Sequence, residues 1–340
     1  MKNTLLVDGN NILQIGFHGV KNVYNKDKHL GALYHFVTTL QKHLLEDSYD
    51  KIVIFWDGPK GGHFRKEIQE TYKANRKKNR MDADQFQSMM EQKNRISEYL
   101  EELFIRQCQF DMCEADDAIA YYCQNSPDEF KTILSEDKDL TQLIGPQVSQ
   151  YLPRKKIILE NGDKVTFGKT DIPSVNTVLV KVLMGDKSDN IEGIWYLGEK
   201  TLLSLFPEIV EREVGLDEVL KKTKRLVEED GNTTKGLLNL YNGKCKSGVK
   251  GKEFFEINKL LVDLEFPYLT DEAKSDILDT ITLPMDPTDR KIENVVTMTL
   301  KDGLSKFLPK NNNQWLDFFE PFVELIKKEM YNFKNYKKDV

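Results

Sequence analysis

Residues 182–201, VLMGDKSDNIEGIWYLGEKT, combine paired acids, a glycine-flanked turn and the start of a helix. Asp186 and Asp189 stand three residues apart, and if they lie on one helical turn, their carboxylates share a face that can bind a hard cation. The turn runs from Gly193 to Gly198, and a predicted helix begins directly after it. Because glycines let backbone amides approach a phosphate at a helix N-terminus, the stretch also predicts a contact with a nucleic-acid backbone.

Composition bounds the size of the protein and its location. The 340 residues suffice for one large domain plus a smaller one, or for two of medium size. The formal net charge of -6 argues against a protein that coats DNA by global attraction, but residues 60–80 carry eight Lys/Arg and two Glu, so local fields still allow DNA binding. The four cysteines form no Cys-x-x-Cys pair, the five histidines show no ligand spacing, and the apolar N-terminal run is broken at Asp8. We expect a soluble cytoplasmic protein without a signal peptide or a membrane segment.

Three predicted strands each stop at acidic residues. Residues 4–7 are followed by Asp8, residues 51–56 by Asp57, and residues 132–135 by Asp137 and Asp139. Helical stretches separate these apolar runs, so we predict an α/β fold with a mixed, mostly parallel sheet flanked by helices. In such sheets the carboxyl ends of the strands line the functional crevice, so these acids are expected to meet there. Two further segments, 148–152 and 156–159, predict a hairpin.

A further acidic group, Glu114, Asp116 and Asp117, precedes an apolar helical run. Helix capping accounts for one or two of these acids but not for all three. We therefore predict that one crevice collects nine acids: Asp8, Asp57, Glu114, Asp116, Asp117, Asp137, Asp139, Asp186 and Asp189. Like charges this close raise one another's pKa unless cations neutralise them, and oxygen ligands favour Mg²⁺ or Mn²⁺ over zinc.

The predicted crevice suits hydrolysis at a phosphate. Two divalent ions about 4 Å apart can activate a water molecule and stabilise the departing oxygen. Lys73 and Arg76 are the candidates for the cations that balance the remaining phosphate charge. No Ser, Cys or His is placed for covalent catalysis, which favours direct attack by water.

Two segments are rich in basic residues. The connection over residues 60–103 is unusually long for a compact sheet, and it changes from a basic run to an amphipathic helix. A solvated helix face and a substrate path both explain the basic run, and its place directly after an acid-tipped strand favours the substrate path. Residues 221–259 carry ten Lys/Arg against five Asp/Glu, and their glycine-rich part is either a contact for a phosphate backbone or a mobile loop.

Several blocks resemble the signature motifs of one family. Glu-Ala-Asp-Asp (114–117), Ser-Glu-Asp-Lys-Asp-Leu (135–140) and Gly-Asp-Lys-Ser-Asp-Asn-Ile-Glu-Gly (185–193) are similar to those of the flap endonuclease and 5′-nuclease family. That family includes the nuclease domain of bacterial DNA polymerase I and the phage 5′-exonucleases. Phe64-Arg65 and the block 72–76 match its helical arch, and the resemblance covers about residues 5–264. The tail, with Asp302 to Phe307, resembles the T-even phage ribonuclease H branch, which implies a free-standing phage-type enzyme.

The resemblance implies a domain plan and a substrate. A nuclease core like that of PIN proteins would span residues 1–175 with the arch at about 60–103, and a helical domain would span 176–340 with a helix–three-turn–helix at about 176–206. Two Mg²⁺ ions, replaceable by Mn²⁺, would serve cleavage near single-strand/duplex junctions. The implied DNA contacts are Arg65, Lys66, Tyr72, Lys77, Lys78, Gly193, Gly198, Lys200 and Thr201.

The implied biology is the removal of RNA primers and 5′ flaps during DNA replication. Substrates would be DNA with 5′ flaps or nicks and RNA–DNA hybrids. A monomer in the cytoplasm, of a bacterial host cell if phage-encoded, is expected, with a single-stranded-DNA-binding protein or a sliding clamp as a partner.

Two positions depart from the family pattern, and two other functions stay open. Tyr196 stands where the family hairpin usually has a glycine. It therefore stays open whether the hairpin forms a tight turn, binds a K⁺ ion and binds duplex DNA strongly. Glu136 replaces another usual glycine. A catalytically silent junction-binding replication scaffold would explain the basic segments but not the clustered acids. A small ribonuclease of the related PIN type would lack the hairpin and the basic run.

Overall fold

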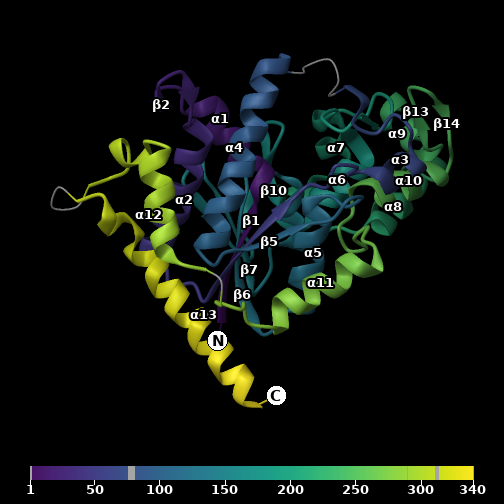
Figure 1. Cartoon of the computed structure of the whole chain (residues 1–340). Helices are drawn as coiled ribbons and strands as arrows, with labels where there is room; N and C mark the ends of the chain where they lie inside the picture. The colour runs from purple at the N-terminus through teal and green to yellow at the C-terminus, as the bar shows by residue number, and fades with distance from the viewer. Residues whose placement is uncertain (1, 76–80, 289, 311–313, 340) are drawn as a thin grey trace.

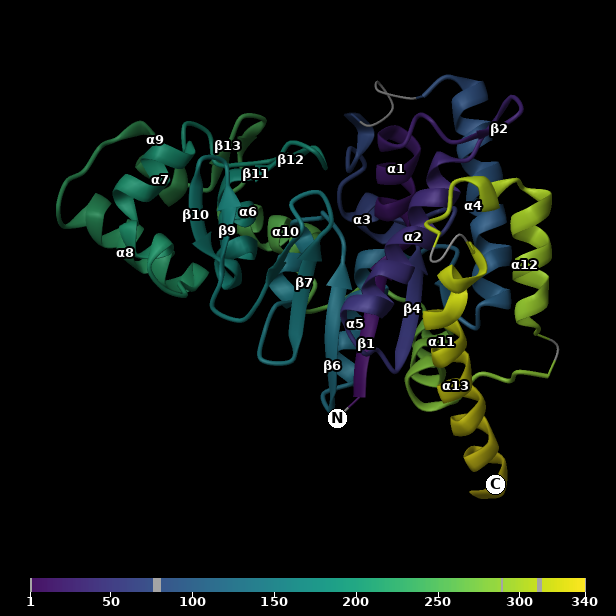
Figure 2. The same ribbon diagram turned by 90° about the vertical axis from the view of Figure 1, so that its left-hand side faces the viewer.

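A six-stranded sheet lies at the centre of the computed structural model, which describes residues 2–75, 81–288, 290–310 and 314–339 (Figures 1 and 2). The strand order is β5 (Arg106–Gln109), β4 (Lys51–Trp56), β1 (Lys2–Asp8), β6 (Glu129–Leu134), β7 (Val148–Leu152) and β8 (Ile157–Leu159). The first five strands are parallel, and β8 pairs antiparallel with β7. The predicted mixed, mostly parallel sheet is confirmed.

The strands with continuous apolar runs are where the sequence predicts them, and the hairpin of β7 and β8 is present. The edge strand β5 was not predicted, because its sequence Arg-Gln-Cys-Gln has no apolar alternation and it forms through pairing with β4. A separate two-stranded sheet joins β9 (Lys164–Phe167) to β10 (Thr170–Pro173). Short hairpins are formed by β2 (Tyr24–Asn25) with β3 (Lys28–His29), β11 (Gly185–Asp186) with β12 (Ile191–Glu192), and β13 (Lys244–Cys245) with β14 (Gly248–Val249).

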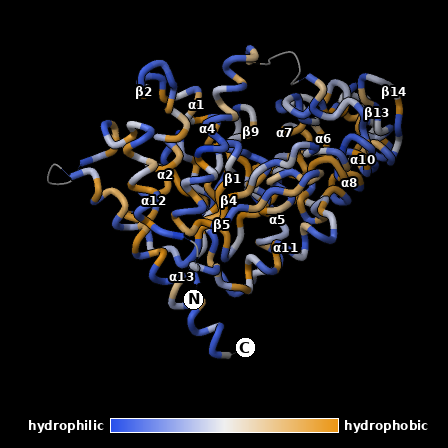
Figure 3. The backbone as a smooth tube through the Cα atoms, viewed as in Figure 1, coloured by the Kyte–Doolittle hydropathy of each residue, from blue (hydrophilic) through white to orange (hydrophobic). Residues whose placement is uncertain are grey.

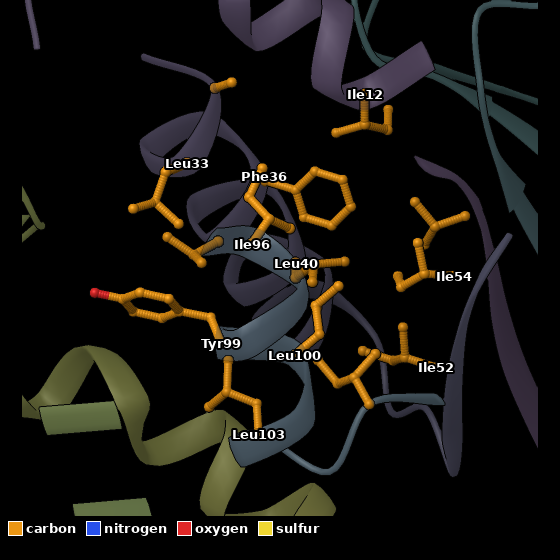
Figure 4. Packing of buried hydrophobic residues seen from close by; sticks show 14 of the residues in the cluster. Ile12, Leu33, Phe36, Leu40, Ile52, Ile54, Ile96, Tyr99, Leu100 and Leu103 are labelled. Carbon is orange, nitrogen blue, oxygen red and sulfur yellow. The ribbon is translucent and has the colours of Figure 1, made fainter. Parts of the chain in front are cut away.

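Both faces of the sheet are covered by helices. Leu5 and Val7 of β1 belong to one core and Leu6 belongs to another, as the alternation of side chains along a strand requires. On the first face lie α1 (Gly9–Gly19), α2 (Gly31–Glu46) and α4 (Ala83–Glu102), and on the second face lie α5 (Ala115–Asn125) and α11 (Asp271–Thr282). Figure 4 shows the first core, where Phe36 of α2, Leu100 of α4 and Ile54 of β4 meet. In Figure 3 the orange, hydrophobic segments concentrate in this central layer.

A third core holds together a lobe beside the sheet (Figure 2). Its helices are α6 (Thr177–Met184), α7 (Glu199–Leu205), α8 (Leu216–Glu228), α9 (Lys235–Tyr241) and α10 (Glu253–Val262), and α3 (His63–Ile68) contacts it through α10. Phe206 and Phe254 are fully or almost fully buried in this core. The predicted helix–three-turn–helix is present as α6, the turns after it and α7.

The C-terminal helices return to the central sheet. The helix α11 packs on α5, α12 (Ile292–Lys301) packs on α4, and α13 (Glu320–Asp339) packs on α2. Short 3-10 helices complete the described elements: Asp139–Leu143, Ser174–Asn176, Pro207–Val210, Leu304–Lys306 and Leu316–Phe319. Within the described ranges, no helix combines the length and the apolar composition needed to span a membrane. The proposed division at residues 175 and 176 stays a prediction.

One buried glutamine fixes α4 against α2. The N-terminus of α2 has no capping side chain of its own, and the Gln92 amide oxygen accepts hydrogen bonds from Ala32 N (2.9 Å) and Leu33 N (3.3 Å). Gln92 is 1% exposed. The first N–H groups of a helix have no acceptor within the helix and need one from elsewhere. By supplying this acceptor, Gln92 ties α4 to the start of α2.

We expect Gln92→Leu to lower the free energy of unfolding by about 1–3 kcal/mol, because two buried N–H groups lose their acceptor. Urea unfolding measures this change. Gln87→Leu, on the exposed side of the same helix, is the matched control and should change stability by less than about 0.5 kcal/mol. Equal stabilities of the two variants would contradict the capping role of Gln92.

Candidate active site

Two clefts, of about 630 Å³ and about 1060 Å³, meet at the carboxyl edge of the sheet. Lys73, Asp116 and Asp137 line both of them, so the clefts form one groove. Among the described residues that line the groove there are nine acids and four lysines. Eight of these acids are predicted ones: Asp8, Asp57, Glu114, Asp116, Asp137, Asp139, Asp186 and Asp189.

Neighbouring donors orient the acids at the carboxyl ends of β1 and β4. Asp8 caps α1 by accepting from Asn11 N (3.0 Å), and its second oxygen accepts from Ser135 Oγ (2.8 Å). Asp57 accepts from Ala115 N (2.9 Å) and from Asn10 Nδ2 (2.5 Å). These bonds hold one carboxylate from each strand at the groove, in fixed orientations.

The charge in this part of the groove is poorly compensated. Burial, with Asp57 and Asp137 nearby, raises the pKa of Asp8 to about 7. Burial and the neighbouring carboxylates of Asp137 and Asp8 raise the pKa of Asp116 well above its usual value. The side chain of Asp116 makes no hydrogen bond or ion pair with any residue in the described part of the chain. Closely spaced carboxylates of this kind fit the binding of a divalent cation, whose oxygen ligands they can supply.

The third of the acids before α5 has a different environment. Asp117 is 1% exposed, and both of its oxygens accept from the Arg65 guanidinium, at 2.6 and 2.9 Å. It also accepts from Tyr268 N (3.1 Å). Because these donors occupy its carboxylate, Asp117 is a structural partner of Arg65. It does not line the groove, although it was predicted to join the other eight acids there.

Two residues that the resemblance implies as DNA contacts are also buried. Arg65 is 4% exposed and pairs with Glu114 (2.9 Å) as well as with Asp117. Tyr72 is 4% exposed, and its hydroxyl lies 3.3 Å from Glu114 and from Asp189. Both side chains support the acids from within the protein, so neither presents a surface to DNA.

Asp139, Asp186 and Asp189 form the other end of the groove. One carboxylate oxygen of each lies within 4.8 Å of the others, an arrangement that could hold a metal ion. Lys181 of α6 pairs with Asp139 and with Asp186 (2.6 Å). Burial opposes it, but this ammonium and the donors of Ser188 lower the pKa of Asp186 to about 2.

The premise that Asp186 and Asp189 share a helical turn is wrong. The helix α6 ends at Met184, and Gly185 (φ 72°) redirects the chain into β11. A Cβ at Gly185 would lie 2.4 Å from Gly193 N, and one at Gly193 would lie 2.0 Å from Met184 O. The glycines therefore permit close packing of two backbone segments, and this packing brings the two aspartates together.

Lys73 lies where the two clefts meet. Its backbone has a φ of 56° and donates to Asp189 O (2.8 Å), while its ammonium pairs with Glu114 and lies 3.8 Å from Asp189. Lys73, one of the two predicted cations, thus lies in the groove. The other predicted cation, Arg76, and the predicted DNA contacts Lys77 and Lys78 lie outside the described residues.

The remaining predicted DNA contacts are spread over the surface. Lys66 and Lys200 are exposed, and Thr201 is half-buried on α7. Gly198 caps α7 with open space around its Cα, whereas Gly193 is packed against Met184. The hairpin turn itself is intact, because Leu197 N donates to Ile194 O (3.1 Å) while Tyr196 adopts a φ of 64°. The question that Tyr196 left open about the tight turn is answered in favour of the turn.

Sequence reasoning missed three residues that line the groove, Asn10, Asn11 and Lys181, and it missed Ser135, which is buried behind the groove. Asn10, Asn11 and Ser135 orient the carboxylates, and Lys181 pairs with two of them. The signal for Lys181 was present: it is the only charge in the apolar run Thr177–Met184. A lone lysine in such a run, 7% exposed here, indicates a buried carboxylate partner.

We expect Arg65→Met to lower the free energy of unfolding by about 3–5 kcal/mol, because it leaves the buried carboxylate of Asp117 without its cation and takes one of two cations from Glu114. Chemical denaturation measures the loss. Lys66→Met, next to it but exposed, is the control and should leave stability nearly unchanged. If Arg65→Met kept full stability and lost only DNA affinity, the structural role would be wrong.

We expect Asp116→Asn to stabilise the metal-free protein at pH 8. The folded protein raises the pKa of Asp116, so this side chain contributes stability below about pH 4 that is lost as the pH rises through the folded pKa. Asparagine does not ionise, so the variant does not lose this stability as the pH rises. The difference in stability between the variant and the wild type should therefore be smaller at pH 5 than at pH 8. Thermal unfolding in EDTA at both pH values measures the effect.

In the same assay, Mg²⁺ should raise the melting temperature of the wild type more than that of Asp116→Asn. Asp217→Asn, an exposed acid on α8, should behave as the wild type does. If Asp116→Asn were less stable than the wild type at pH 8 without metal, the claim that the charge of Asp116 is poorly compensated would be contradicted.

Comparisons with known proteins agree with this geometry. The family described as "5'-3' exonuclease, N-terminal resolvase-like domain" matches residues 3–169. The 5'-3' exonuclease of Halalkalibacterium halodurans is 30% identical over 217 residues, which cover 60% of this chain and 69% of that protein. DNA polymerase I of Geobacillus stearothermophilus is 33% identical over 214 residues, which cover 61% of this chain and 24% of that protein. The chain thus matches about a quarter of the length of the polymerase.

A solved structure has the same fold. The bacteriophage T5 flap endonuclease, in a pseudo-enzyme-product complex with DNA and metal ions, superimposes with a TM-score of 0.63 at 21% identity. The match covers 82% of this chain and 99% of that chain. The sequence matches show that the chain belongs to the 5'-3' exonuclease family and is a nuclease.

Proposed function

We propose that this chain is a Mg²⁺-dependent, structure-specific 5′→3′ exonuclease and flap endonuclease with a two-metal mechanism. The observation that carries the proposal is the groove at the carboxyl edge of the sheet, where acids from five separate segments surround Lys73 and Asp116. Membership of the 5'-3' exonuclease family supports the direction of cleavage.

The donor set fits two hard divalent ions. Carboxylate oxygens from Asp8, Asp57, Asp116 and Asp137 would hold one ion, and those from Asp139, Asp186 and Asp189 would hold the other. Bound Mg²⁺ or Mn²⁺ would supply an activated water and charge stabilisation for the leaving oxygen. Asp117 has no part in either set, because Arg65 occupies its carboxylate.

The residues around the acids have separable roles. Ser135 donates to Asp8 and accepts from Asp137 N (2.9 Å), so its hydroxyl orients ligands and is not a nucleophile. The ammonium of Lys73 would contact the scissile phosphate, and its position at the junction of the two clefts supports this role. Lys181 neutralises part of the charge of Asp139 and Asp186 in the absence of substrate.

The shape of the groove suggests the path of the substrate. Met81, which precedes α4, forms one wall of the larger cleft together with Phe86 and Met89 of α4, and α1 forms another. A single 5′ strand would pass beside this wall, with the adjoining duplex on the side of α6 and α7. The substrates in this proposal are DNA with 5′ flaps or nicks and RNA–DNA hybrids, and the role is the removal of RNA primers and flaps during replication.

The cellular setting is part of the same proposal. The protein would act as a monomer in the cytoplasm, next to a single-stranded-DNA-binding protein or a sliding clamp.

We expect the purified protein to shorten 5′-labelled flap and RNA-primed duplexes in Mg²⁺ and to be inactive in EDTA. Asp137→Asn and Asp186→Asn should each reduce cleavage by about 100-fold or more while DNA binding persists, because each removes an ion ligand from the groove. Product gels and anisotropy on matched flap, nicked and RNA-primed substrates measure the two properties.

Asp217→Asn is the control acid and should cleave as the wild type does. Equal cleavage in excess EDTA would contradict the metal mechanism. Binding of junctions by the wild type without any cleavage in Mg²⁺ or Mn²⁺ would instead support a silent replication scaffold.

A further inference from the structure

The segment that carries Asp186 and Asp189 is joined to the segment that carries Lys73. The first segment, residues 186–190, makes the turn from β11 to β12, and the second, residues 69–75, follows α3. Hydrogen bonds connect the two segments, although more than a hundred positions separate them in the sequence. Their contact therefore links two carboxylates of the second acidic cluster to the cation in the groove.

Asn190 is at the centre of this contact. Its side-chain Nδ2 donates to Thr71 O (2.8 Å), and its backbone oxygen accepts from Gln69 Nε2 (2.9 Å). The backbone of Asn190 is left-handed (φ 60°), a conformation that asparagine adopts more readily than most residues. Glycine would adopt the same backbone but has no amide to donate, so the side chain of Asn190 contributes more than the turn.

Two further hydrogen bonds extend the contact on either side. Lys73 N donates to Asp189 O (2.8 Å), and Asn75 Nδ2 donates to Lys187 O (2.6 Å). Lys73 itself has a left-handed backbone (φ 56°), which this bond helps to hold. The backbone position of Lys73 thus depends directly on the residue that supplies one carboxylate of the second cluster.

Hydrogen bonds carry a large share of this contact. Thr71 is exposed, and Gln69 and Asn190 are half-buried. All three line a pocket of about 320 Å³, so side-chain packing around them is incomplete. Removing one hydrogen bond here should therefore change the relative position of the two segments, and neighbouring side chains offer little to prevent it.

We infer that Asn190 is a positioning residue that couples the second acidic cluster to Lys73, an inference that rests on the proposed function. When Asp186 and Asp189 share an ion, residues 186–190 lose freedom of movement, and the contact at Asn190 passes this restraint to the backbone of Lys73. The ammonium of Lys73 is then held in line with the phosphate. Because coupling between two sites is reciprocal, a phosphate bound by Lys73 favours ion binding at the second cluster.

The first test is a double-mutant cycle on flap DNA, measured as single-turnover cleavage rates in Mg²⁺. Asn190→Gly keeps the left-handed backbone and removes the donor to Thr71, so it should lower the rate about tenfold by misplacing Lys73. Affinity for the same DNA, measured by anisotropy in Ca²⁺, should change less than about twofold. In a Lys73→Ala background the same substitution should have almost no effect on the rate, because its effect depends on Lys73.

A second variant approaches the contact from the other segment. Gln69→Leu removes the donor to Asn190 O and should reproduce the same pattern, including where Asn190→Gly fails to fold. Asn161→Gly is the matched control, because it makes the same substitution in an exposed turn between β8 and β9. It should cleave and bind DNA as the wild type does.

A second readout is independent of cleavage. Because Asn190 follows Asp189 directly, Asn190→Gly should weaken Mn²⁺ binding at the second cluster about tenfold, as the loss of a residue that orients a metal ligand does. Calorimetry without DNA measures this affinity, and the ion of the second cluster is the one whose binding Asp186→Asn abolishes. Binding of the other ion, near Asp8 and Asp116, should be unchanged.

Two results would overturn the inference. One is an equal fractional loss of rate from Asn190→Gly with and without Lys73, which would show that the two residues act independently. The other is an unchanged Mn²⁺ affinity together with unchanged cleavage rates for both Asn190→Gly and Gln69→Leu. Failure of the wild type to cleave in Mg²⁺ would contradict the proposed function instead, and the Mn²⁺ titration would still decide whether Asn190 supports the second cluster.

Discussion

Repulsion between carboxylates at the carboxyl edge of the sheet is the constraint on which the rest of this structure depends. Parallel strands that are buried on both faces deliver Asp8 and Asp57 to one edge, and the segments after β6 and α6 add acids from the other side. The protein offsets part of this charge with its own cations: Arg65 beneath Glu114, Lys73 between the clefts, and Lys181 between Asp139 and Asp186. Around Asp8 and Asp116 the offset is incomplete, as their raised pKa values indicate. A folded chain tolerates such a site when its function is to bind cations.

The sequence predicted those parts of the site that local pattern determines. Apolar runs ending in acids located β1, β4 and β6, and the rule that strand ends meet at one edge brought their acids together. Asp116 and Asp117 show the limit of this reasoning. Consecutive residues on a helix point in different directions, so only one of the two reaches the groove, and the sequence does not say which. Asp117 is the one that pairs with Arg65 and does not reach the groove. This ion pair joins residues about fifty positions apart, so it appears only in the tertiary structure.

The same limit explains the other differences. Arg65 and Tyr72 belong to a basic and aromatic run whose composition suggests a nucleic-acid surface, yet tertiary packing buries both beneath the acids. Asp186 and Asp189 converge through the close, glycine-permitted packing of two backbone segments and not through helical spacing, although the predicted proximity is correct. At the hairpin, the tyrosine that departs from the family pattern keeps the turn at the expense of backbone strain.

The most direct measurement is anomalous diffraction from crystals grown with Mn²⁺. The account predicts two peaks in the groove, one among Asp8, Asp57, Asp116 and Asp137 and one among Asp139, Asp186 and Asp189. It also predicts that Lys181 moves away from the second group when the ion binds. Crystals saturated with Mn²⁺ that show no peak in the groove, or that show ions only at surface acids, would contradict the claim that this negatively charged edge is built for divalent cations.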